Sequence, residues 1–192
     1  MDDDVVKMHL QQKLRAAREA LVWKLDGLSE CDIRRPMTPT GTNLLGLVKH
    51  NAISDARYFG DVFGRPFPEQ LPRWDDPAVA GMDHWAAASE TRDQIVDLYR
   101  RTWAHSDATI SALDLDDTGF VPWWQETVPL FNVMAARLVD AARHAGHADI
   151  LRELLDGGVG VDVDGLPLHG RDSSYWEARR SLIEDAARAQ RT

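Results

Sequence analysis

The sequence predicts an all-α protein, a four-helix bundle with long connections and a short C-terminal helix. Apolar residues recur at helical spacing in four long segments, and caps and breakers stand near the ends of these segments. We therefore expect no substantial sheet. The four helices are expected at about 5–27, 43–63, 90–113 and 128–156.

The first two helices are separated by a connector in which prolines interrupt any helical periodicity. Thr42 is expected to cap the second helix, and Gly64 and Pro66 are expected to end it. The first helix carries its apolar stripe at Leu10, Leu14, Ala17, Leu21 and Leu25.

The third and fourth helices follow a loop at about 65–88, and loops of this length often line functional sites. Thr91 and Gln94 stand at capping-box spacing where the third helix begins. Thr127 is expected to cap the fourth helix, with Pro129 tolerated in its first turn.

The chain is expected to form one domain, with the bundle at about 5–156 and a C-terminal extension at 157–192 that ends in a helix at 175–189. Connectors of roughly 14, 25 and 14 residues exceed those usual between neighbouring bundle helices. This excess argues against a minimal up-down-up-down arrangement.

Composition excludes several classes of function. With 192 residues, 44% hydrophobic and 28% charged, the chain is typical of a soluble globular protein. Its net charge of -9 repels phosphate backbones, so nucleic acid is not expected as a partner. No apolar run approaches the roughly 20 residues that cross a bilayer. An acidic N-terminus and a single cysteine, Cys31, fit a cytoplasmic protein, and we interpret Cys31 as incidental.

A candidate metal site lies on the fourth predicted helix. Asp140 and His144 stand four residues apart and His147 follows three further on, so all three share one helix face. A carboxylate and an imidazole one turn apart can bind one metal ion. Alone, this pattern is more often a solvated helix face. His50, in the middle of the second helix, is the further candidate.

Two segments, LLGLVKH at 44–50 and ARHAGHADILRELLDG at 142–157, resemble the signature helices of the DinB-like metal-binding superfamily. Within it, the chain is most similar to the mini-circle protein branch, which is related to mycothiol-dependent maleylpyruvate isomerase. The resemblance implies a bundle whose second and fourth helices hold one divalent metal through His50, Asp140 and His144. Relatives often carry Glu or His at the position of Asp140, whose side chain is shorter than Glu by a methylene. His147 is therefore either a neighbour of the ligands or a substitute for Asp140.

Three classes of function stay open on this reasoning. The first is a metal-dependent transferase or isomerase that uses a low-molecular-weight thiol of the mycothiol type and a small-molecule substrate. The second is a stress-related metal-binding protein without turnover, and the third is a helical bundle that acts through oligomer contacts. The combination of His50, Asp140 and His144 disfavours the third class. No catalytic residue and no thiol-binding residue is assigned.

Zinc is the preferred metal for two imidazoles and a carboxylate, with nickel, iron and manganese as alternatives. A homodimer is expected, since relatives often pair and C2 pairing is common. Trp176 and Leu182 of the tail are candidate contacts. We interpret Trp123 and Trp124 as packing at one end of the bundle. No role is assigned to His9, His84, His105 or His169.

Overall fold

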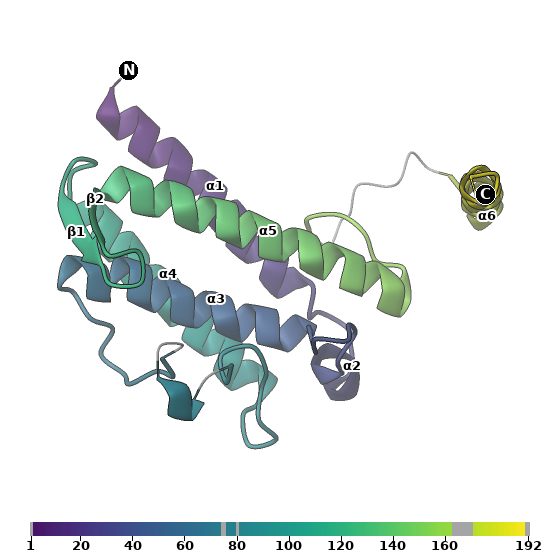
Figure 1. The fold of residues 1–192 in the computed structure, drawn as a ribbon, viewed down its shortest axis with the longest axis horizontal. Helices are drawn as coiled ribbons and strands as arrows, with labels where there is room; N and C mark the ends of the chain where they lie inside the picture. The colour runs from purple at the N-terminus through teal and green to yellow at the C-terminus, as the bar shows by residue number, and fades with distance from the viewer. Residues whose placement is uncertain (1, 74–75, 80, 163–170, 191–192) are drawn as a thin grey trace.

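A computed structural model describes the chain except at residues 1, 74–75, 80, 163–170 and 191–192. Its helices and one small hairpin confirm the all-α class (Figure 1). His169 lies outside the described residues. The bundle consists of α1 (Asp3–Trp23), α3 (Leu44–Phe59), α4 (Arg92–Ala112) and α5 (Leu130–Asp156). The shorter elements are α2 (Glu30–Arg34), α6 (Ser173–Arg188) and the 3-10 turns η1 (Asp61–Phe63) and η2 (Pro77–Val79).

The helix starts follow local capping, with one correction. Asn43, not Thr42, caps α3, because Asn43 has the extended backbone of a cap and its side-chain oxygen accepts the Gly46 N–H at 2.8 Å. The capping box of Thr91 and Gln94 is present at the start of α4. The first helix ends at Trp23, earlier than expected.

The start of α5 also differs from the expectation. Thr127 lies in strand β2 (Glu126–Pro129), which pairs antiparallel with β1 (Thr118–Val121). Pro129 is the N-cap of α5, and the helix begins at Leu130. The hairpin forms because Val121 and Val128 point into the core from opposite strands.

Helix α3 lies at the centre of the bundle. It packs mainly against α4 on one side and against α5 on another, while α1 packs along α5 (Figure 1). Fourteen of its sixteen residues are buried, and the two exceptions are His50 and Tyr58. Burial on almost all sides explains why its apolar residues do not form a single stripe.

A buried ion cluster joins three of the helices, and we use this name for Arg18, Asp55 and Arg137. Asp55 accepts from Nε of Arg18 at 2.8 Å and from Nε of Arg137 at 3.1 Å. The side chains are 1%, 0% and 1% exposed, respectively. Asn51 accepts a further bond from Arg137 at 3.2 Å. Pairing is what makes such burial tolerable, since an isolated buried charge is strongly unfavourable.

Helix α6 has no buried residue, and Figure 1 shows it apart from the bundle. Its apolar side chains, including Leu182 and Ile183, are exposed. The homodimer, with Trp176 and Leu182 as candidate contacts, stays a prediction. In the part of the chain that the structure describes, no helix is both long and apolar enough to cross a membrane.

Candidate metal centre

Three side chains from two helices converge at the α3–α5 interface, and we call His50, Asp140 and His144 the metal triad. One possible ligand atom from each lies within 4.8 Å of the other two. Nε2 of His144 is 3.3 Å from Oδ1 of Asp140, and the His50 and His144 ring centroids are 4.9 Å apart. The structure thus brings together the residues named from the sequence, while their ligation of a metal stays a prediction.

Asp83 holds the ring of His50. Its Oδ2 lies 2.7 Å from Nδ1 of His50, and Asp83 is 1% exposed. Burial raises the pKa of Asp83, but the hydrogen bond to His50 and the nearby His84 lower it more, so the net shift is downward. A carboxylate on Nδ1 leaves Nε2 of His50, which lies 3.5 Å from the Ser54 hydroxyl, as the nitrogen that could bind a metal, and this is the usual arrangement around metal-bound histidine.

His84, to which the sequence analysis assigns no role, stacks on a face of the same ring. The His50 and His84 centroids are 4.3 Å apart at an interplanar angle of 15°. His50, Asp83 and His84 form a second group of potential ligands within 4.8 Å of one another. Burial lowers the pKa of His84 first, and repulsion from His50 adds to the shift, so the neutral ring is favoured.

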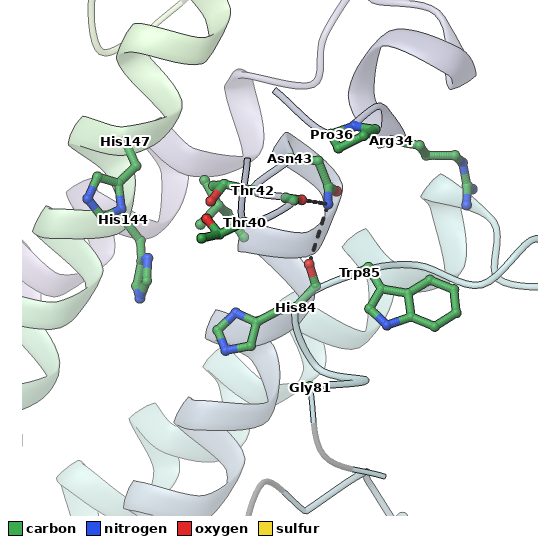
Figure 2. Close-up of a pocket in the computed structure, with 12 residues that line it drawn as sticks. Arg34, Pro36, Thr40, Thr42, Asn43, Gly81, His84, Trp85, His144 and His147 are labelled. Atoms are coloured by element: carbon green, nitrogen blue, oxygen red, sulfur yellow. Dashed lines mark hydrogen bonds between the residues drawn. The ribbon is translucent and has the colours of Figure 1, made fainter. Parts of the chain in front are cut away.

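The loop that carries Asp83 and His84 is held against the first turn of α3. The side-chain amide of Asn43 donates to the backbone carbonyl of His84 at 3.4 Å (Figure 2). A Cβ added at Gly46 would collide with that same carbonyl. Glycine at position 46 is therefore required for this close approach of loop and helix.

Arg137 connects the metal triad to the buried ion cluster. Its Nη1 donates to Oδ2 of Asp140, which leaves Oδ1 on the side of His144. Burial raises the pKa of Asp140, but the hydrogen bond with His144 and the charge of Arg137 outweigh it, and the net shift is downward. Asp140 is therefore held as a carboxylate, the form that binds a metal.

His147 lies at the edge of the site. Its side chain is exposed, its ring centroid is 5.6 Å from that of His144, and within the described ranges it belongs to neither group of potential ligands. Three residues of α-helix turn the side chain about 60° away from His144. This position fits a neighbour of the site better than a substitute for Asp140.

The metal triad lies between two cavities. The histidine cavity, about 650 Å³, is lined by His84, His144 and His147 and reaches Arg34, Thr40, Thr42 and Trp85. Figure 2 shows His84 and His144 approaching it from different sides. The tryptophan cavity, about 340 Å³, is lined by His50 and Asp140 together with Tyr58, Trp123 and Trp124.

A family model described as mycothiol-S-transferase matches residues 9–157. The chain belongs to the mycothiol-S-transferase family. This family is part of the DinB-like superfamily, so the resemblance seen in the two helical segments is confirmed. The match covers the bundle with all three residues of the metal triad and ends before α6.

Solved structures agree with the fold of this mycothiol-S-transferase family member. A conserved protein from Enterococcus faecalis is similar with a TM-score of 0.58 and 16% identity, over 80% of this chain and 98% of that chain. At this identity the likeness shows the fold alone. No curated protein matches the chain.

The residues of the site fit a divalent metal. Two imidazoles and a carboxylate are the donors that zinc takes in three-ligand sites with an open position. Nδ1 of His144 is buried and has no hydrogen-bond partner among the residues that the structure describes. The other nitrogen, Nε2, lies beside the carboxylate of Asp140, and ion binding at the site would fix the orientation and tautomer of this ring.

Proposed function

We propose that the protein is a metal-dependent S-transferase that uses mycothiol and a small electrophilic substrate. The observation that carries this proposal is the convergence of His50, Asp140 and His144 at the boundary of two cavities. The family supports thiol transfer. The histidine cavity gives one substrate access to His144, and the tryptophan cavity gives the other access to His50 and Asp140.

The reaction couples proton loss to bond exchange. The thiol gives up its proton, its sulfur bonds to an electrophilic carbon, and the leaving group departs with the electron pair of the broken bond. A divalent metal, when bound, supplies the charge that lowers the pKa of a thiol toward neutrality. The chain itself prepares the donors: Asp83 fixes the ring of His50, and Arg137 fixes the carboxylate of Asp140.

The histidine cavity suits the thiol. Its wall away from the metal triad carries hydroxyl groups of Thr40 and Thr42 and the guanidinium of Arg34. Mycothiol is a thiol linked to polyhydroxylated rings, which hydrogen-bond to such groups. Arg34 is held in place by the backbone carbonyl of Ala87 at 3.2 Å, so this wall is structured without ligand.

Substitution of the ligands tests the proposal. His144→Ala should abolish stoichiometric metal binding, whereas Asp140→Asn should weaken it less, because an amide oxygen still offers a neutral donor. Elemental analysis of purified protein, then titration of the metal-free protein with zinc, nickel, iron and manganese, measures both effects. A transfer assay with mycothiol should show activity in the metal-loaded wild type that His144→Ala lacks.

Two results would refute the assignment. One is stoichiometric metal in purified His144→Ala, and the other is mycothiol transfer that survives complete metal removal. His147→Ala serves as the matched control, since His147 lies one turn further along α5 and is exposed. It should keep its metal, because its ring belongs to neither ligand group in the described part of the chain.

A further inference from the structure

The tryptophan cavity is separate from the histidine cavity, although both reach the metal triad. The two share no lining residue: His144 faces one, while His50 and Asp140 face the other. The two residues of α3 that are not buried, His50 and Tyr58, both line the tryptophan cavity. Through this cavity a ligand can reach His50 and Tyr58 of the central helix.

The aromatic wall of the cavity is held rigidly. Nε1 of Trp123 donates to the hydroxyl of Tyr58 at 2.8 Å, and the two rings meet edge to face with centroids 4.8 Å apart. The guanidinium of Arg57 lies over Trp123 at 4.8 Å, and that of Arg137 over Tyr58 at 5.5 Å. A wall fixed in this way loses little conformational entropy when a ligand binds.

The β-hairpin delivers both tryptophans to the site through a strained turn. Gln125 has a φ of 57°, in the left-handed region that is unfavourable for a non-glycine residue. Trp124 N–H donates to the carbonyl of Val121 at 3.1 Å and closes the turn. Backbone strain of this kind persists where the surrounding structure fixes it, and it is concentrated at binding and active sites.

The wall also indicates the chemistry of a ligand. Tyr58, Trp123 and Trp124 present aromatic surface, and aromatic faces attract flat, electron-poor rings and the positive edges of other rings. A volume of about 340 Å³ is at the small end of ligand sites and suits a molecule of one or two rings. Apart from the tyrosine hydroxyl and the indole nitrogens, the polar groups of the lining belong to His50, Asp140, Ser54 and Arg137, where the reaction would occur.

We propose that the tryptophan cavity is the subsite for the electrophilic substrate and that this substrate is a flat, electron-poor aromatic or conjugated compound. The inference rests on the proposed function, because it assigns the second substrate of the same reaction. With 1-chloro-2,4-dinitrobenzene as the model substrate, the sulfur–carbon bond forms and the carbon–chlorine bond breaks. Chloride leaves with the electron pair, and the thiol proton passes to solvent.

Binding is tested first, without any reaction. Titration calorimetry measures the affinity of the purified protein for 1,3-dinitrobenzene, which has no leaving group. Trp124→Ala should weaken binding about tenfold or more, since it removes an aromatic contact together with the apolar surface that the ring would bury. Trp124→Phe restores a flat ring and should recover most of the affinity. Circular dichroism confirms that each variant is folded.

Two other tryptophans provide matched controls. Trp176 lies on α6 and packs against Tyr175, away from both cavities, so Trp176→Ala should leave the binding of 1,3-dinitrobenzene unchanged. Trp85 lines the histidine cavity. With mycothiol and 1-chloro-2,4-dinitrobenzene, Trp85→Ala should raise the KM for the thiol, whereas Trp124→Ala should raise the KM for the electrophile.

The outcomes separate this inference from the proposed function. Equal binding of 1,3-dinitrobenzene to wild type and Trp124→Ala, or no binding to either, overturns the subsite even when mycothiol transfer is observed. Binding that depends on the ring at position 124 supports the subsite. If such binding occurs but metal-loaded protein transfers mycothiol to no electrophile, the proposed function fails and the aromatic site stands.

Discussion

Two polar clusters share the α3–α5 interface, and they differ in how deeply their groups are buried. In the buried ion cluster a carboxylate lies between two guanidiniums, and each of the three side chains is at most 1% exposed. In the metal triad the side chains of the two histidines are 14–15% exposed and that of Asp140 is 38% exposed. In each cluster one buried nitrogen has no hydrogen-bond partner among the described residues, Nη2 of Arg18 in the first and Nδ1 of His144 in the second.

This difference indicates that the buried ion cluster stabilises the fold, whereas the metal triad is placed to bind a ligand. Oppositely charged side chains that pair inside the bundle fix the relative positions of the helices. The imidazoles and the carboxylate of the metal triad are more exposed and line the two cavities, so they are available to bind an ion or a substrate. Arg137 belongs to the first cluster and holds Asp140 of the second, so the buried ion cluster orients the metal triad.

The largest effect is expected from breaking the buried ion cluster. Asp55→Ala leaves two guanidiniums buried without their carboxylate and should lower the free energy of unfolding by about 3–5 kcal/mol. Urea unfolding of the metal-free protein measures this change. Asp140→Ala, which removes the other carboxylate partner of Arg137 at a half-exposed position, should cost about 1 kcal/mol or less. Similar losses in the two variants would contradict the distinction between the clusters.

A smaller and more selective effect is expected at Asp83. Asp83→Ala removes the carboxylate that orients His50 and should weaken zinc binding about 10–100-fold, as is usual for residues that hold a metal-bound histidine. Asp83→Asn keeps an acceptor and should retain most of the affinity. Calorimetric zinc titration measures both, and Asp76→Ala, an exposed acid of the same loop, is the control. Unchanged zinc affinity in Asp83→Ala would show that Asp83 is only structural.

The smallest effect is expected in the acid response of the metal-free protein. The pKa of Asp140 is lowered in the folded state, so its contribution to stability is present above the unfolded pKa of about 3.9. That contribution is lost as the pH falls through the lower folded pKa. At pH 7 the free energy of unfolding of the wild type should exceed that of Asp140→Asn by about 1 kcal/mol or less, because Asp140 is half-exposed. This difference should disappear below about pH 4. Urea unfolding at pH 7, 5 and 3 in the presence of EDTA tests this, and a difference that grows toward pH 3 would refute it.

The sequence predicted those features that depend on helical periodicity. Asp140 and His144 share a face because four residues complete about one turn, and His50 reaches them because it is the central residue of a buried helix. The long helices were found for the same reason. Thr91 and Gln94 were recognised because the capping box is a local signal.

The features that were missed depend on tertiary contacts. Asp83 and His84 lie in a loop without periodicity, and only its contact with α3 brings them to His50. Strands β1 and β2 have four residues each, too few for a clear alternation of apolar and polar residues. The left-handed position of the turn is occupied by Gln125, whereas a glycine there would have indicated a hairpin. Arg137 was overlooked because a basic residue on a helix is usually exposed, whereas here Asp55 pairs with it.

The missing side chain of Gly46 extends the set of positions on which the site depends. Because a Cβ there would collide with the carbonyl of His84, Gly46→Ala should displace the loop and with it Asp83. In a saturation-mutagenesis library selected for zinc binding, position 46 should tolerate as few replacements as position 144, although it contributes no ligand atom. Helical positions such as Gly146, where an added Cβ meets no atom, should accept alanine freely. The positions on which the candidate metal centre depends therefore include Gly46, whose contribution is the absence of a side chain.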